Sequence, residues 1–109
     1  MKSTAFISLL LLLTCYSCKK SDTVPECLQS HIDHLANFSC DHGASVKKYN
    51  FQGRNVYVFS MGYCGADLPV SVLDENCNSL GSLGGIWGNT RINGVEFSTA
   101  KYIKTIWSR

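Results

Sequence analysis

Residues 49–64, YNFQGRNVYVFSMGYC, constrain the fold of this chain more than any other stretch. Tyr49 and Phe51 alternate with polar neighbours up to a glycine turn at residues 52–54, and a β-branched and aromatic run follows at residues 56–59. Two such runs around a glycine turn are typical of a β-hairpin. We therefore expect strands at about residues 45–51 and 55–61, followed by a loop that carries Cys64.

The first 18 residues have the composition of an export signal. Lys2 precedes an apolar run at residues 5–13, which is shorter than the ~20 residues that a membrane-spanning helix needs. The run leads to Cys15 and Cys18, and a short apolar segment that ends at a cysteine resembles the signal of a bacterial lipoprotein. Ser17 suits a cleavage point and favours Cys18 as the lipidated residue. Cys15, or an ordinary secretory signal without lipid, is the alternative.

These features divide the chain into three parts. We expect a lipoprotein signal peptide at residues 1–17, a polar tether at residues 18–25 and one small domain at residues 26–109. A lipid on Cys18 would hold this domain at the outer membrane, on its periplasmic or its surface side. The formal net charge is only +2, and no basic run is interleaved with aromatic residues, so we expect no nucleic-acid partner. The basic residues Lys101, Lys104 and Arg109 are interpreted as a solvated strand face.

One helix is expected before the hairpin, at residues 26–37. Leu28, Ile32 and Leu35 follow the i, i+4, i+7 spacing of a single apolar helix face. Asn37 and the loop that follows mark its end. A small domain needs such an apolar face to cover one side of a sheet.

Four cysteines remain in the expected domain: Cys27, Cys40, Cys64 and Cys77. An even number in a small exported domain predicts two disulfides, for which three pairings exist. If the helix and the first three strands alternate in direction, Cys40 lies beside Cys64 at one end of the sheet and Cys77 lies near Cys27 at the other. This arrangement favours the nested pairing Cys40–Cys64 with Cys27–Cys77. The cysteines are too far apart in sequence for the paired spacing of zinc ligands.

The second half of the chain predicts more antiparallel sheet. A strand is expected at residues 70–74, a hairpin around Asn93-Gly94, a short helical turn at residues 98–101 and a final strand at residues 102–107. The glycine-rich residues 80–89 are expected to form an irregular connection that places Ile86 and Trp87 in or over the core. The predicted fold is α+β, with one N-terminal helix packed on about five antiparallel strands and stapled by disulfides.

Few residues suit catalysis or metal binding. The chain has no GxSxG motif, and its cysteines are expected to be oxidised rather than free nucleophiles. His31 and His34 lie three residues apart on the expected helix, but a polar helix face explains them better than a metal site does. We therefore expect a protein that is not an enzyme and that holds neither a metal nor another cofactor.

The candidate binding loop is formed by Tyr63, Asp67 and Trp87, with Trp107 as a further exposed aromatic candidate. Core packing is the favoured alternative for the three aromatic residues. Asp67 is the one loop acid of interest, and capping of a turn through its carboxylate is favoured over catalysis.

Several segments together resemble a group of small envelope lipoproteins from Bacteroidetes-type bacteria, whose function is unknown. The resemblance includes the lipidated cysteine, a Tyr-x-Phe-x-Gly-x-x-Val-Tyr hairpin, a Cys-x-x-Asp loop and a Gly-Gly segment, and it covers most of the chain after the signal. Its residues here are Tyr49, Phe51, Gly53, Val56, Tyr57, Cys64, Asp67, Gly84 and Gly85. The resemblance implies a location in the cell envelope and implies no activity.

The sequence therefore predicts a non-enzymatic lipid-anchored envelope protein that binds a protein or a small ligand with its loops. A periplasmic inhibitor of a lysozyme or protease is a more specific alternative, because the chain is small, exported and cross-linked near a loop. A thiol–disulfide role is the enzymatic alternative, although the four cysteines of the expected domain do not form the CxxC motif of such proteins.

Overall fold

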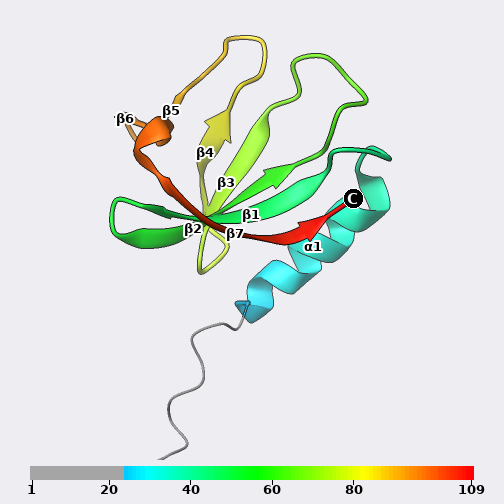
Figure 1. The fold of residues 1–109 in the computed structure, drawn as a ribbon, viewed down its shortest axis with the longest axis horizontal. Coiled ribbons are helices and arrows are strands. Elements are labelled where there is room, and N and C mark those ends of the chain that lie inside the picture. Colours follow the sequence, from blue (N-terminus) through cyan, green and yellow to red (C-terminus); the bar gives the residue numbers. More distant parts are fainter. Residues whose placement is uncertain (1–23) are drawn as a thin grey trace, which may run out of the picture.

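The computed structural model describes residues 24–109, so the predicted signal peptide and most of the tether lie outside the described part. Chain order is α1 (Glu26–Phe38), β1 (Ser45–Phe51), β2 (Arg54–Ser60), β3 (Val70–Asp74), β4 (Ser79–Leu83), β5 (Arg91–Ile92), β6 (Val95–Glu96), a 3₁₀ turn η2 (Phe97–Thr99) and β7 (Lys101–Ser108). Among the described residues, no helix is long and apolar enough to cross a membrane. The predicted α+β fold is confirmed (Figure 1).

Helix α1 forms where its apolar spacing predicts it. Leu28, Ile32 and Leu35 are all buried, and together they make one stripe that faces the sheet. Pro25 precedes the first turn, and the helix ends one residue later than expected, where the Ser39 amide donates a hydrogen bond to the Leu35 carbonyl.

Five strands form an antiparallel sheet in the order β4-β3-β2-β1-β7. Its central hairpin, β1–β2, is joined by Gln52 and Gly53, which both have positive φ angles, as a tight hairpin turn requires. The last strand returns beside the first, so β7 pairs with β1 along its whole length and contains two register shifts. The β1–β2 hairpin that the sequence predicts is therefore at the centre of the sheet.

Each face of the sheet has its own hydrophobic core. On the helix-side face, α1 packs on residues that include Val46, Tyr57, Phe59 and Leu73. On the opposite face, the β5–β6 hairpin and η2 cover Phe51, Val56 and Val72, with Ile92 at the centre of that cluster. Alternation along the strands thus supplies apolar side chains to both faces, and the small domain has one layer on each side of its sheet.

The glycine-rich connection differs from its prediction. Residues 80–83 are part of β4, an edge strand that pairs with β3, and not an irregular segment. Ile86 and Trp87 are 81% and 93% exposed, so the prediction that they pack in or over the core is wrong. Ile92 fills that place instead, and its Cδ1 atom approaches Gly81, where a side chain larger than hydrogen would be crowded.

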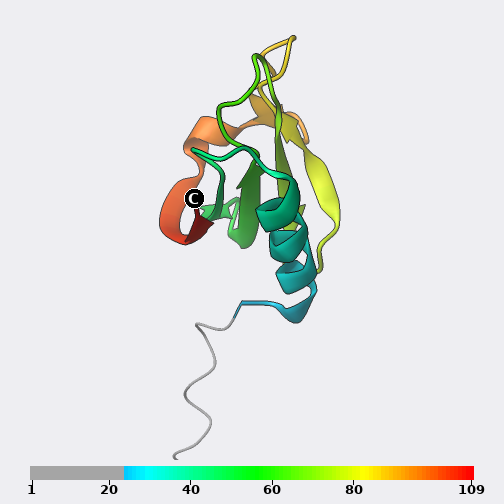
Figure 2. The same cartoon turned by 90° about the vertical axis from the view of Figure 1, so that its right-hand side faces the viewer.

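The domain has two chemically different ends. At the tether end, the chain enters at Val24, and the turn at residues 75–78 is joined to the start of α1 by the Cys27–Cys77 disulfide. At the loop end, the connections at residues 61–69 and 84–90 lie together, because Val70 and Leu83 are paired neighbours. Figures 1 and 2 both show these two loops projecting at the far side of the domain from the start of α1.

Candidate binding site

The connection between β4 and β5 is a rigid tip that displays two apolar side chains. Gly84 and Asn89 exchange backbone hydrogen bonds of 2.8 and 3.1 Å, and the Gly88 amide donates to the Gly85 carbonyl at 3.1 Å. These bonds leave only Ile86 and Trp87 at the apex. The three glycines in this tip have positive φ angles, so the sharp reversal depends on residues without a side chain.

Asn89 fixes the base of this tip. Its side-chain amide donates to the carbonyl oxygens of Ser82 and Arg91, at 2.7 and 2.8 Å. The Asn89 Oδ1 atom accepts from the Arg91 amide, so the whole side chain is engaged in holding the backbone. Trp87 is therefore presented by an ordered support, although its ring is almost fully exposed.

A hollow of about 530 Å³ separates this tip from the loop at residues 61–69. We call it the loop-end pocket; its walls include Asp67, Pro69, Ser82, Ile86 and Trp87. Among the described residues, nothing donates a hydrogen bond to the Asp67 carboxylate, so the predicted turn-capping role is wrong. The Asp67 backbone is in the left-handed region, with φ of 56°. The lining of the pocket combines this acidic residue with the indole of Trp87.

Tyr63 lies in a second, smaller hollow of about 250 Å³, next to Cys40, Asp41, His42 and Cys64. Its ring is 82% exposed, yet one side covers Gly43 so closely that a Cβ atom at that position would overlap it. The Tyr63 amide also donates to the His42 carbonyl at 3.1 Å. Tyr63 is therefore an exposed aromatic side chain with a supported position, but it does not share the loop-end pocket.

The Cys40–Cys64 disulfide joins the segment after α1 to the loop at residues 61–69. The Cys40 amide donates to the Met61 carbonyl at 2.9 Å, which aligns the two segments beside the bridge. With Cys27–Cys77 at the other end, the structure contains the nested pairing that the sequence predicted. Each end of the domain is thus cross-linked once.

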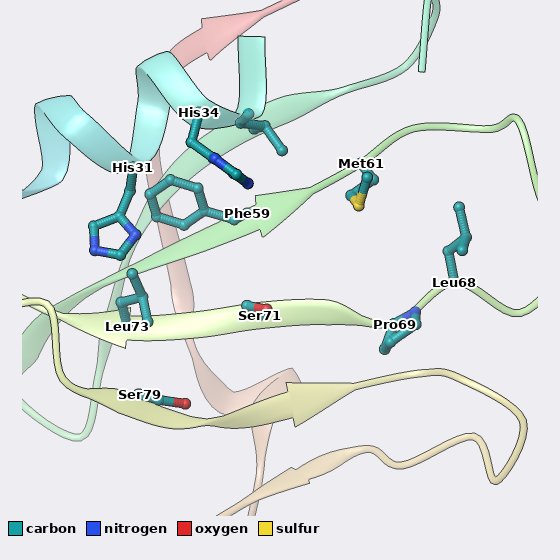
Figure 3. A pocket seen from close by; sticks show the side chains of 10 residues that line it. His31, His34, Phe59, Met61, Leu68, Pro69, Ser71, Leu73 and Ser79 are labelled. Carbon is teal, nitrogen blue, oxygen red and sulfur yellow. The ribbon is translucent and has the colours of Figure 1, made fainter. Parts of the chain in front are cut away.

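A third hollow, of about 470 Å³, lies on the helix-side face between α1 and strands β2 to β4 (Figure 3). It exists because α1 covers only part of the sheet and because Ser71 and Ser79 are too small to fill the space. His31 and His34 border it from α1 and lie on either side of the Phe59 ring, and the His31 and Phe59 ring centroids are 6.1 Å apart. No group of three or more potential metal ligands occurs among the described residues.

The clearest electrostatic perturbation lies at the tether end. The Asp74 carboxylate accepts hydrogen bonds from the Asn78 and Asn76 amides, both at 2.9 Å, and forms a 3.2 Å ion pair with Arg54. These contacts, above all the Asn78 amide, lower the pKa of Asp74 against the opposing effect of desolvation. At Glu96, hydrogen bonding by Arg91 likewise lowers the pKa. Burial, with a smaller contribution from Glu75, raises the pKa of Tyr57.

Residues 34–109 match the model of a family described as a domain of unknown function (DUF6970). The chain belongs to the DUF6970 family. No curated protein and no solved structure matches the chain. The region matched to DUF6970 includes Cys40, Cys64 and Cys77 and both loops of the loop end, whereas Cys27 and the first turns of α1 precede it.

Within this DUF6970 domain, the structure places Asp67 and Trp87 on one pocket and Tyr63 on another. The prediction of core packing is wrong for Tyr63 and Trp87, which are both exposed. It is confirmed for Trp107, which packs against the helix-side core and lies under the Arg109 guanidinium. Ile86, an exposed neighbour of Trp87, was not among the predicted binding residues. The signal that could have identified it was the set of glycines on both sides of the Ile-Trp pair, which is typical of a tight turn. The predicted lipidation site Cys18 lies outside the described residues.

Proposed function

We propose that this protein is a non-enzymatic, lipid-anchored protein of the cell envelope that binds a partner protein with its loop end. The observation that carries the proposal is the display of Trp87 and Ile86, both more than 80% exposed, on a hydrogen-bonded tip at the opposite end of the domain from Val24. An anchor before Val24 would leave that tip directed away from its attachment point.

Large exposed apolar side chains are unfavourable in a protein unless a partner covers them. Apolar surface that stays in water gains nothing from folding and promotes association, whereas a partner that covers it gains the free energy of desolvation. Tryptophan and tyrosine are the residues most enriched among the energetically dominant positions of protein interfaces. Trp87 and Tyr63 fit this role, because their supporting backbone is already ordered and little conformational entropy is lost on binding.

The polar surroundings suggest what part of a partner enters the loop-end pocket. Asp67 and Trp87 line the same pocket, and the pocket has no basic side chain in its lining. A lysine or arginine side chain can pair with a carboxylate and stack on an indole ring at the same time. We therefore propose a partner that places a basic side chain between Asp67 and Trp87.

The anchor is tested by the intact mass of the protein purified from the membrane fraction of its own cells. We expect a chain that starts at Cys18 and carries added acyl mass, with no cysteine alkylated until the disulfides are reduced. A chain that starts elsewhere and carries no lipid would overturn the anchoring part of the proposal and leave the binding part standing.

The binding surface is tested by placing the photoreactive residue p-benzoylphenylalanine at position 87 of the full chain in living cells. We expect a discrete adduct with one protein, which is lost when Asp67→Asn is added. The matched control carries the same residue at position 102, because Tyr102 is also an exposed aromatic residue but lies on β7. Equal adducts from both positions, or none from either, would contradict the assignment of the loop end.

Inhibition of a lysozyme or protease is the second candidate function. The observation in its favour is the convex shape of the tip, because an exposed indole on a rigid turn suits insertion into the cleft of an enzyme. The purified protein at micromolar concentration is assayed against a panel of such enzymes, beside the Trp87→Ala variant. Inhibition by the natural chain alone would support this function, and an uninhibited panel would exclude it for those enzymes.

A further inference from the structure

Three lysines share one side of the two strands β1 and β7. Lys48 pairs directly with Lys104, and Asn50 of the same strand pairs with Lys101. Lys48 also pairs with Tyr57, whose side chain belongs to the helix-side core. Because paired residues of an antiparallel sheet point to the same face, all three lysines lie on the helix-side face. We call Lys48, Lys101 and Lys104 the basic face.

The fold does not neutralise this face. Like charges placed directly opposite each other on neighbouring strands repel, and this arrangement lowers the stability of a sheet. The ion pairs of the described residues are Arg54–Asp74 and Arg91–Glu96, and neither includes a lysine of the basic face. The turn acid Glu75 accepts a hydrogen bond from Asn55 of β2 and is in neither of these ion pairs. A repulsive lysine pair without an internal counter-charge fits an external anion.

The position of the basic face indicates which anion can reach it. The row that holds Lys101 is toward the tether end, since its partner Asn50 also pairs with Asn55 next to the Arg54 turn. The row of Lys48 and Lys104 follows it at the middle of β1. Val24, where the described chain begins, packs against the core of the same helix-side face. The proposed lipid on Cys18 is six residues earlier, and six residues span at most about 20 Å. The basic face is therefore held close to whatever surface contains that lipid.

We propose that the basic face docks on the anionic phospholipid headgroups of the membrane that holds the Cys18 lipid, an inference that rests on the proposed anchor. One lipid modification and one basic patch are the usual pair of signals for stable attachment to a membrane surface. Attraction between lysines and an anionic bilayer extends only over about 8 Å in physiological salt, a range that the short tether makes accessible. Docking in this way fixes the orientation of the domain, with the loop end directed into the surrounding compartment.

The test measures the reactivity of single lysines on the full, lipid-bearing chain reconstituted into vesicles. One set of vesicles is phosphatidylcholine, and the other contains phosphatidylglycerol as well. The amines are acylated briefly with a water-soluble succinimidyl ester, and the modification of each lysine is measured by peptide mass spectrometry. We expect Lys48, Lys101 and Lys104 to react roughly fivefold more slowly on the anionic vesicles, and this difference to disappear in about 1 M salt.

Lys47 is the internal control, because it is adjacent to Lys48 but pairs with Val58 of the opposite face. The acylation rate of Lys47 should be the same on both kinds of vesicle. In the Lys48→Gln/Lys104→Gln variant, we expect Lys101 to lose its protection, whereas Lys47→Gln should leave that protection unchanged. Equal rates for the basic face on both kinds of vesicle would overturn the docking, even where the protein floats with the vesicles. If the chain does not co-float with phosphatidylcholine vesicles in a density gradient, this result would overturn the proposed anchor and, with it, the docked orientation.

Discussion

The tether end and the loop end each contain one disulfide, but their turns are held by different means. At the tether end, a side chain holds the backbone: the Asp74 carboxylate caps the turn at residues 75–78 and pairs with Arg54. At the loop end, the uncharged Asn89 side chain holds the base of the tip. Glycines there permit close turns and close contacts, as at Gly43 under Tyr63 and at the glycines around Trp87.

This difference determines what each end offers to a partner. Capping by a carboxylate engages the polar groups of the tether-end turn internally. Glycine turns leave the neighbouring side chains unused, so Tyr63, Ile86 and Trp87 remain free to contact another molecule. An end that is stabilised through its backbone conformation can thus display apolar side chains without losing order.

The largest effect is expected from removing the tether-end disulfide. The Cys27→Ala/Cys77→Ala variant opens a bridge with a sequence separation of 50, and we expect the free energy of unfolding to fall by about 3–4 kcal/mol. Urea unfolding of the natural and variant chains measures this difference. The bridge and Trp87 are at opposite ends of the domain. The variant should therefore keep its Trp87-dependent binding as long as it is folded. Loss of that binding in the folded variant would show that the two ends are coupled.

A pair of glycine substitutions compares the two ends directly. Gly62 and Gly53 have φ angles of 104° and 80°, but only at Gly62 would a Cβ atom overlap the backbone, at the His42 carbonyl oxygen. We expect Gly53→Ala to lower the free energy of unfolding by about 1 kcal/mol, the backbone penalty alone, and Gly62→Ala to lower it by about 2–3 kcal/mol. Chemical denaturation measures both. Equal losses would contradict the close approach of Gly62 to the His42 carbonyl.

A smaller effect is expected from pH at the tether end. The pKa of Asp74 is lower in the folded chain than in the unfolded chain, so its contribution to stability is complete above the unfolded value, about 4, and is lost as the pH falls through the folded value. Unfolding midpoints measured between neutral and acidic pH should therefore fall less steeply for Asp74→Asn than for the natural chain. Asp67→Asn, a substitution on the exposed loop, is the matched control and should change the neutral midpoint less than Asp74→Asn does.

The smallest effect on stability is expected at the tip. Trp87 is 93% exposed, so Trp87→Ala should change the free energy of unfolding by no more than about 0.5 kcal/mol. The same substitution should remove binding of the proposed partner. A loss of several kcal/mol in thermal or urea unfolding would mean that the indole packs on the domain, and it would contradict the role of the tip as a display surface.

Most of the fold follows from local patterns in the sequence. The apolar spacing of Leu28, Ile32 and Leu35 places α1, and the alternation around the Gln52-Gly53 turn places β1 and β2 within one residue of their observed bounds. The disulfide pairing follows as well, because the direction of each element decides which cysteines meet. These predictions depend on contacts between neighbours in the chain or on simple alternation of direction.

The candidate site was only partly predictable. Aromatic residues in loops can be identified from the sequence, but the same residue types also fill small cores, and composition does not separate the two cases. Trp107 packs against the core while Trp87 does not, although both are tryptophans within the last quarter of the chain. The contact between Gly43 and Tyr63 joins residues 20 positions apart, and no local pattern indicates it.

The amino-acid sequence by itself determined the α+β class, the helix, the central hairpin and the cysteine pairs that cross-link each end. Its periodic apolar positions are local and need no knowledge of the remaining chain. Only the tertiary structure decided that β4 forms an edge strand, that Ile92 rather than Trp87 fills the second core, and that Lys48 is opposite Lys104. The physical reason is that each of these outcomes depends on competition between distant segments for the same face of one sheet, and that competition is resolved only when the whole sheet has formed.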